Sequence, residues 1–335
     1  MENVELNTNV SEIKKKKMPW WKKTLLIIGS TLGSIIAVFL SLVLILNVIK
    51  SGIYFEYYSM REVICTNHGL GDNYNSQGTA VTNDGKYVLT SGYMSDKTNS
   101  RIYIIDVETD TAKHIKLVKD GKVNKYHMGG IAISDVHNTV YLASNNRLFM
   151  LNLNDVLNAE DGAEFEIGEG FAVNNEASFV FTDDKYLFVG EFHNGKEYIT
   201  ENTYTWEGVT HNAITGVYDI VTHELLYVIS IRDKVQGFAV SPSGGILLST
   251  SYGLPSSEFY FYKADSVIET QELYDGVPLY FLGDHDYKIV GPAMSEGLDY
   301  RDGLFYTNFE SSCNKYFFGK LFIGSNYIVG IKAEK

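Results

Sequence analysis

The chain has 335 residues, of which 45% are hydrophobic and 13% aromatic, and its 41 acidic side chains outnumber its 28 basic ones to give a net charge of −13. This composition is typical of a globular protein with a sizeable core and excludes an intrinsically disordered chain. The acidic balance argues against nucleic-acid binding, because affinity for a phosphate backbone depends on clustered lysine and arginine.

An apolar stretch near the N-terminus is the first element of the chain. Residues 24–49 contain no charged side chain, and this length is enough to cross a hydrocarbon core of about 30 Å as a helix. Six lysines precede it between residues 14 and 23, together with Trp20 and Trp21. The positive-inside rule therefore predicts a cytoplasmic basic tail over residues 1–23, a transmembrane helix, and a cell-membrane protein whose remainder is extracellular.

A cleaved signal peptide is the alternative interpretation of this stretch. The stretch is longer than the apolar core of about 7–15 residues that signals usually have, and it lacks a small-residue cleavage motif. The first 50 residues have a net charge of +4, which leaves −17 for the rest. We expect a juxtamembrane linker over residues 50–61 and an extracellular domain over 62–335, whose acidity suits calcium, cationic ligands or simple solubility.

A short signature recurs five times in the extracellular part. Each copy has a glycine at its second position, a large apolar residue or threonine next, then alanine or aspartate, then a residue that favours strands. The copies begin 40 to 67 residues apart, which is the spacing of blades in a β-propeller. They are Gln77-Gly78-Thr79-Ala80-Val81, Gly129-Gly130-Ile131-Ala132-Ile133, Glu169-Gly170-Phe171-Ala172-Val173, Gln236-Gly237-Phe238-Ala239-Val240 and Glu296-Gly297-Leu298-Asp299-Tyr300.

The segments after each signature predict an all-β fold of four-stranded blades. A polar turn follows each copy, and then come a second and a third apolar segment. A fourth segment precedes the next signature, but the last blade lacks one, whereas residues 62–65 form an extra strand before the first signature. We expect this N-terminal strand to complete the last blade and close the ring.

The number of blades is five if each signature begins one blade. The longest interval, between the third and fourth copies, leaves room for a sixth. Its surplus is the polar stretch 193–211, which favours a long loop. Five blades are therefore the preferred prediction, and six remain the alternative.

The first residue of each signature is expected at the mouth of the central channel, where the loops of one face gather and function usually lies. Four of the five are glutamate or glutamine, namely Gln77, Glu169, Gln236 and Glu296. Their oxygens suit a hard cation, so they are candidate ligands of calcium. The alternative is that they are polar channel residues that bind only water and backbone.

Other loops on the same face supply further candidates. His127 lies two residues before Gly129, where an imidazole could act as a base or a ligand, or remain a hydrated loop histidine. The remaining residues of the predicted ligand-binding face are Tyr93, Asn145, Glu191, His193, Tyr252 and Glu310.

The chain contains two cysteines, Cys65 and Cys313. If residues 62–65 are the outer strand of the last blade, Cys65 ends on the same face as the loop that contains Cys313. Thiols outside the cytoplasm can oxidise, so the pair is a candidate disulfide. Two buried free thiols are the alternative.

The motifs around two of the signatures resemble those of known propellers. They are Gln236-Gly237-Phe238-Ala239-Val240 with Pro242-Ser243-Gly244-Gly245, and Ser295-Glu296-Gly297. On these residues the chain is similar to the secreted and surface β-propellers that include the SMP-30/gluconolactonase, strictosidine-synthase-like and YncE-like groups. The gluconolactonase resemblance implies that Glu296, a glutamate before glycine on an inner strand, is a metal ligand.

Two functions follow from these observations. The first is a membrane-anchored module that binds an extracellular ligand or protein partner through the channel-mouth face. The alternative is a calcium-dependent hydrolase or lactonase, with Glu296 and Glu169 as metal ligands and His127 as the base.

Overall fold

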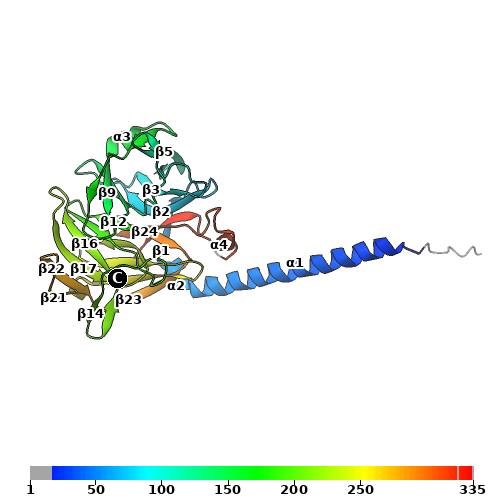
Figure 1. Ribbon diagram of the computed structural model, residues 1–335. Coiled ribbons are helices and arrows are strands. Elements are labelled where there is room, and N and C mark those ends of the chain that lie inside the picture. Colours follow the sequence, from blue (N-terminus) through cyan, green and yellow to red (C-terminus); the bar gives the residue numbers. More distant parts are fainter. Residues whose placement is uncertain (1–16, 323, 334–335) are drawn as a thin grey trace, which may run out of the picture. The chain divides into compact units, whose positions relative to one another are not determined.

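The computed structural model describes residues 17–322 and 324–333, and its elements are shown in Figure 1. Its contacts divide the chain into two compact units, Met1–Val48 and Ile49–Lys335. The basic segment predicted over residues 1–16 lies outside the described residues. The first described residues carry the start of a long helix, and the second unit carries the strands.

Helix α1 (Trp20–Ile53) is the apolar segment that the sequence predicts. It is long and apolar enough to cross a membrane, a property that N-terminal signal sequences share. None of its side chains is buried in the protein. An apolar helical surface is stable in an apolar environment such as lipid, because contact with water is unfavourable for it.

The segment predicted as a juxtamembrane linker, residues 50–61, contains the end of α1 and helix α2 (Phe55–Met60). Tyr54 and Tyr57 are fully buried, and the ring of Tyr57 stacks on Phe259, with centroids 6.2 Å apart. Two aromatic side chains therefore fix this segment in the core of the propeller.

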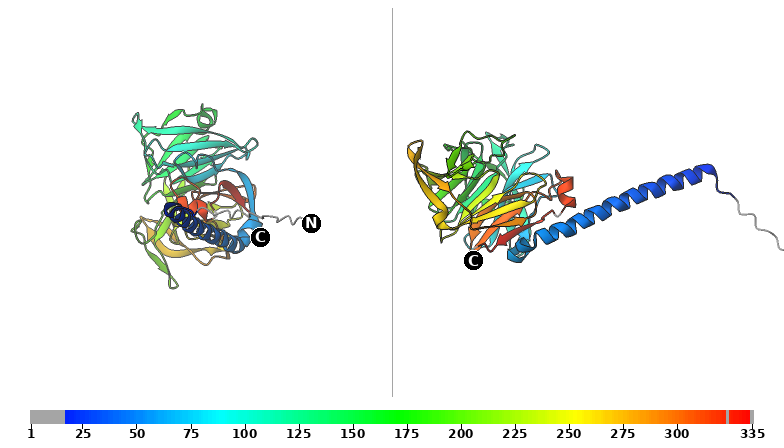
Figure 2. Two further views of the ribbon diagram at one scale, coloured as in Figure 1. Left: turned by 90° about the vertical axis from the view of Figure 1, so that its right-hand side faces the viewer. Right: turned by 90° about the horizontal axis from the view of Figure 1, so that it is seen from below.

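The strands of the described residues form five four-stranded antiparallel blades around a channel (Figures 1 and 2). From the channel outward, blade 1 is β2 (Tyr74–Val81), β3 (Tyr87–Met94), β4 (Arg101–Asp106) and β5 (Thr111–Lys119). Blade 2 is β7 (Gly130–Ser134), β8 (Thr139–Ser144), β9 (Arg147–Asn152) and β11 (Phe171–Ala172). Blade 3 is β12 (Phe179–Thr182), β13 (Tyr186–Gly190), β16 (Ala213–Asp219) and β17 (Leu225–Ile231).

Blades 4 and 5 complete the ring. Blade 4 is β18 (Val235–Val240), β19 (Ile246–Thr250), β20 (Ser257–Tyr262) and β23 (Tyr287–Gly291). Blade 5 is β24 (Ser295–Arg301), β25 (Leu304–Phe309), β26 (Tyr327–Ile331) and β1 (Arg61–Thr66). The blue β1 lies beside the red β26 in Figure 2, and the two pair antiparallel from Arg61 opposite Ile331 to Thr66 opposite Tyr327. The predicted five blades and the closure by the N-terminal strand are confirmed.

The glycine of the signature allows neighbouring inner strands to approach closely. A Cβ on Gly78 would lie 2.5 Å from the backbone nitrogen of Ile131, and one on Gly237 would lie 2.6 Å from that of Leu298. Both positions would clash with backbone, so only glycine permits this packing around the channel. The repeat is thus a consequence of how the inner strands meet.

The third copy of the signature is not an inner strand. Phe171 and Ala172 form β11, the outer strand of blade 2, which pairs with β9. Gly170 has a φ of +62°, and a Cβ on it would lie 2.4 Å from the carbonyl oxygen of Leu148 in the neighbouring strand β9. The inner strand of blade 3 is β12, which begins at Phe179 and lacks the glycine.

Additional elements extend the blades without forming a sixth. The hairpin β14 (Tyr204–Trp206) and β15 (Val209–His211) occupies part of the predicted long loop, and the hairpin β21 (Val267–Tyr274) and β22 (Val277–Leu282) adds to blade 3 through a parallel pairing with β17. Strand β10 (Glu164–Glu166) precedes β11 in the chain but pairs in parallel with β5 of blade 1. The remaining short elements are β6 (Lys122–Val123), α3 (Leu153–Asn158), η1 (Ala264–Ser266) and α4 (Phe317–Leu321).

The hydrophobic core lies between neighbouring blades. Phe238 of β18 stacks on Phe188 and Phe179 of blade 3, with ring centroids 5.4 and 6.5 Å away. A continuous cluster of buried residues extends from there through blades 4 and 5. This packing holds the inner strands rigidly, so the side chains at their ends have fixed positions at the channel mouth.

Candidate functional site

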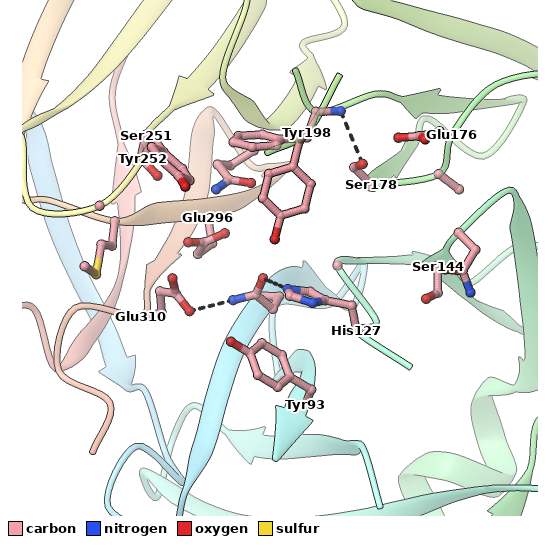
Figure 3. A pocket seen from close by; sticks show the side chains of 18 of the residues that line it. Tyr93, His127, Ser144, Glu176, Ser178, Tyr198, Ser251, Tyr252, Glu296 and Glu310 are labelled. Atoms are coloured by element: carbon pink, nitrogen blue, oxygen red, sulfur yellow. Dashed lines mark hydrogen bonds between the residues drawn. The ribbon is translucent and has the colours of Figure 1, made fainter. Parts of the chain in front are cut away.

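A cavity of about 910 Å³ opens at the mouth of the channel, and all five blades contribute to its lining. Its polar floor is formed by the starts of the inner strands and by the residues next to them. Figure 3 shows that the labelled carboxyl groups of Glu296 and Glu310 point into the cavity on the same side. The polar and aromatic lining residues that the following paragraphs use are Gln77, Tyr93, His127, Glu176, Ser178, Phe192, Tyr198, Gln236, Tyr252, Glu296, Glu310, Lys315 and Tyr316.

The structure brings together three of the four residues predicted as metal ligands. Gln77, Gln236 and Glu296 lie at or near the starts of β2, β18 and β24, and all three line the cavity. Of the other predicted candidates, His127, Tyr93, Asn145, Tyr252 and Glu310 also line it.

Glu169 is the fourth predicted ligand, and the structure places it elsewhere. It precedes the outer strand β11, its side chain is 76% exposed, and its Oε1 lies 3.1 Å from Nζ of Lys119. The expectation that it lies at the channel mouth is therefore wrong, because it rests on the misassigned third signature. Ser178, directly before β12, lines the cavity at that point of the ring.

A chain of hydrogen bonds crosses the floor of the cavity. Nε2 of Gln77 donates to Oε2 of Glu310 over 2.8 Å, and Oε1 of Gln77 lies 2.7 Å from Nε2 of His127 (Figure 3). Because a carboxylate only accepts hydrogen bonds, the amide presents its NH₂ to Glu310 and its oxygen to His127. His127 must then carry its proton on Nε2, which leaves the lone pair of Nδ1 free of any hydrogen bond within the described part of the chain.

His127 is uncharged at neutral pH. The residue is exposed at the cavity, and its ring is partly desolvated where it meets Gln77 and the ring of Tyr93. This desolvation, followed by the positive charge of Lys315, lowers the pKa of His127 to about 4. The imidazole therefore offers a neutral acceptor to a ligand rather than a positive charge.

Glu296 is the most unusual residue of the floor. It is only 2% exposed, and no group among residues 17–322 and 324–333 forms a hydrogen bond with its carboxyl group. Burial, followed by the nearby charge of Glu310, raises the pKa of Glu296 well above its usual range. Burial also raises the pKa of Glu310, to about 7, although Glu310 accepts hydrogen bonds from Tyr316 and Gln77.

Aromatic rings form the walls of the cavity. Phe192 contacts Tyr198 and Tyr252, with ring centroids 5.4 and 6.1 Å away. The hydroxyl of Tyr252 donates to Oε2 of Glu197 over 2.6 Å, which ties blade 4 to the long loop of blade 3. Figure 3 shows Tyr198, from that loop, with its hydroxyl directed into the cavity.

Lys315 supplies a positive charge on the other side. Its Nζ donates to the hydroxyl of Tyr93, and it lies 5.0 Å from the ring centroids of both Tyr93 and Tyr316. The lysine is thus held by two aromatic rings at the edge of the floor.

Two predicted members of the ligand-binding face do not line the cavity. Glu191 is 2% exposed, and its carboxyl accepts hydrogen bonds from Nδ2 of Asn202 over 2.8 Å and from the backbone nitrogen of Ile214 over 3.1 Å. Nδ1 of His193 pairs with Oγ1 of Thr200 over 2.9 Å. Both side chains anchor the 193–211 loop and are occupied by protein groups.

The floor fits a calcium ion poorly. Calcium takes about six to eight oxygen ligands, whereas both ends of the Gln77 amide and one oxygen of Glu310 are engaged with protein groups. Among the residues that the structure describes, no group of three or more histidine, cysteine, aspartate or glutamate side chains is arranged to hold a metal ion. Glu296 and Gln236 are the floor residues whose side-chain oxygens have no protein partner in that part of the chain.

Both cysteines are free and buried, which corrects the candidate disulfide. Cys65 packs with Val81 and Ile328 in the apolar layer between blades 5 and 1. Cys313 lies beside the charged floor, close enough to Glu310 for its charge to act on the thiol. Burial raises the pKa of each thiol to about 12, so both remain protonated.

Several lining residues were not predicted from the sequence: Glu176, Ser178, Phe192, Tyr198, Lys315 and Tyr316. Tyr198, Lys315 and Tyr316 belong to loops between the second and third strands of blades 3 and 5, which the strand order places on the mouth face. The strand order within a blade could therefore have identified these three residues. Ser178 and Glu176 could not be predicted, because the third signature predicts a different inner strand for blade 3.

No family model matches the chain, and no curated protein sequence matches it. Solved structures do resemble it. They include hydrazine synthase from Kuenenia stuttgartiensis (11% identity over 72% of this chain and 58% of that one, TM-score 0.37), the PQQ-bound aldose sugar dehydrogenase from Streptomyces coelicolor (15% identity, 74% and 76%, TM-score 0.44) and the Cps50 (Swd1) β-propeller domain from Myceliophteria thermophila (9% identity, 82% and 100%, TM-score 0.41). The five-bladed description of this chain rests on its own strand pairings.

Proposed function

We propose that this protein is a membrane-anchored, extracellular β-propeller that binds a small polar ligand in the channel-mouth cavity. The observation that carries the proposal is the carboxyl group of Glu296, which is buried, faces the cavity and has no hydrogen-bond partner in the described chain. Because this carboxyl group lines the cavity, a ligand that enters can supply the hydrogen bonds that the described residues do not.

The rest of the cavity supports a binding role. A volume of about 910 Å³ is within the range of pockets for small molecules, and the aromatic walls around Phe192 offer apolar contact area. Among the described residues, no group forms a hydrogen bond with the amide of Gln236, which also lines the floor. Gln236 and Glu296 lie at the starts of inner strands, so the propeller fixes their positions.

Catalysis is the alternative, and one observation favours it: the neutral His127 lines the same cavity, and no described residue forms a hydrogen bond with its Nδ1. With a pKa of about 4, however, this imidazole is a weak base at neutral pH. The calcium-dependent lactonase hypothesis also needs a metal that the floor residues fit poorly. Binding is therefore the preferred function.

The test is a thermal-shift screen of small polar metabolites against the full chain in detergent, run in parallel on wild type, Glu296→Gln and Glu169→Gln. A ligand that binds only the native state raises the melting temperature by mass action. We expect hits on wild type and Glu169→Gln that disappear in Glu296→Gln. Hits that are unchanged in Glu296→Gln would contradict the proposed site.

A further inference from the structure

When both of its carboxyl groups are ionised, the floor of the cavity carries one more negative charge than it neutralises. The buried Glu296 and the half-buried Glu310 face one ammonium group, that of Lys315, and His127 is neutral. Lys315 acts on both carboxyl groups only through space, because its hydrogen bond goes to Tyr93. A ligand with a single positive charge would balance the site when both acids are ionised.

The carboxyl group of Glu296 also lacks hydrogen-bond donors. Glu310 receives them from Gln77 and Tyr316, whereas Glu296 receives none from the described residues. In its ionised form this carboxyl group can only accept, so a ligand that binds that form must donate. A primary ammonium group has three N–H donors and a positive charge, and therefore meets both requirements; a quaternary ammonium meets only the second.

The wall beside these acids suits the organic body of such a ligand. The rings of Phe192, Tyr198 and Tyr252 form one connected surface, and Tyr198 directs its hydroxyl into the cavity (Figure 3). Aromatic faces attract cations and also pack against apolar groups. The cavity is large enough for a molecule of many atoms, so the ligand is more than an inorganic ion.

We propose that Glu296 and Glu310 receive the primary ammonium group of a small organic amine whose body lies against Phe192, Tyr198 and Tyr252. This inference rests on the proposed binding function and names its ligand class. The ammonium group replaces the missing donors of Glu296 and neutralises the excess charge of the floor.

Calorimetric titration of the full chain in detergent at pH 8 with three related probes tests the inference. Benzylammonium has both the positive charge and three N–H donors, and benzyltrimethylammonium has the charge alone. Benzyl alcohol is neutral and has one O–H donor. We expect benzylammonium to bind at least about tenfold more tightly than either of the others, which corresponds to about 1.4 kcal/mol. Calcium chloride is the fourth titrant and is expected to give no saturable binding.

Two variants serve as a matched pair in the same titrations. Glu296→Gln removes a carboxylate from the floor, and Glu169→Gln removes one from the exposed surface of blade 2. Benzylammonium binding should fall at least about tenfold in the first and stay unchanged in the second. A thermal melt of each variant confirms that a loss of binding is not a loss of fold.

Each outcome has a defined meaning. Equal affinity for benzyl alcohol and benzylammonium, or preference for calcium, overturns the amine assignment and leaves the cavity a ligand site. The absence of benzylammonium binding at millimolar concentration also overturns it. Hits in the metabolite screen that depend on Glu296 would then preserve the binding function, whereas hits that ignore Glu296 would remove both.

Discussion

Two buried glutamates of this propeller have similar surroundings and different partners. Glu191 on the blade 3 side and Glu296 on blade 5 are each only 2% exposed, and burial raises the pKa of both, that of Glu191 to about 7. Glu191 accepts hydrogen bonds from Asn202 and from the backbone of Ile214. Glu296 accepts none from the described residues and faces a cavity.

The comparison shows that burial and a raised pKa do not by themselves mark a functional site. Glu191 is a structural group, because its hydrogen bonds hold the loop that reaches the cavity. Glu296 is a candidate site residue, because its carboxyl group lines the cavity and is available to a ligand. The two glutamates differ in two respects: Glu191 has protein partners, whereas Glu296 lacks them in the described chain and lines the cavity.

The largest expected effect is that of removing the structural acid. Glu191→Ala leaves the nitrogen of Ile214 and the amide of Asn202 buried without an acceptor. We expect the free energy of unfolding to fall by about 3 kcal/mol. Thermal unfolding of the detergent-solubilised chain measures it, and a loss below about 0.5 kcal/mol would show that these hydrogen bonds do not hold the loop.

Removing the candidate site acid should have the opposite sign and depend on pH. The folded-state pKa of Glu296 is raised above the unfolded value, so its contribution to stability is fully present below the unfolded pKa and is lost as pH rises through the folded one. Glu296→Gln should therefore gain about 1 kcal/mol over wild type at pH 8 and little at pH 5. Melting temperatures across this pH range measure the difference, and a gain independent of pH would contradict the titration of a buried acid.

Breaking the hydrogen-bond chain of the floor should have an intermediate effect with a spectroscopic signature. Gln77→Met removes the acceptor of the His127 Nε2 proton and one donor of Glu310. We expect a loss of about 1 kcal/mol and a change of His127 from the Nε2–H tautomer to a mixture of tautomers. Nitrogen chemical shifts of the labelled imidazole report the tautomer, and unchanged shifts would show that Gln77 does not set it.

The smallest effect on stability should come from Glu169, the exposed acid that the third signature predicts at the channel mouth. Glu169 forms a surface ion pair with Lys119, and such pairs contribute about 0–1 kcal/mol. Glu169→Gln should change stability by less than about 0.5 kcal/mol and leave ligand binding intact. A loss of binding in this variant would mean that the site extends to blade 2's outer strand.

The sequence predicts the architecture well and the site in part. The glycines of four signatures mark real inner strands, because each one is needed where two inner strands touch, and the missing outer strand of blade 5 correctly indicated ring closure. The third signature misled because Gly170 has a positive φ and contacts the backbone of Leu148 at the outer edge of blade 2. The sequence does not reveal whether a glycine contacts an inner or an outer strand. The inner strand of blade 3, β12, begins at Phe179 and has no glycine at this position. The signature therefore could not identify it.

The sequence predicts which residues lie at the channel mouth, but not which hydrogen bonds their side chains form. The strand order placed Gln77, Gln236, Glu296 and Glu310 at the mouth. It could not show that Gln77 engages both Glu310 and His127, or that Glu191 is satisfied while Glu296 is not. Those distinctions depend on side-chain hydrogen bonds between blades that are distant in sequence.

The most direct test of this account is to measure the thermal unfolding of Glu191→Gln and Glu296→Gln side by side at pH 8. The two substitutions make the same chemical change in two equally buried acids. The account predicts opposite signs: Glu191→Gln lowers the melting temperature because its new NH₂ faces the donors that Glu191 binds, and Glu296→Gln raises it because an unpartnered buried charge is removed. If Glu296→Gln lowers the melting temperature as Glu191→Gln does, Glu296 is a structural residue and the binding site is not where we place it.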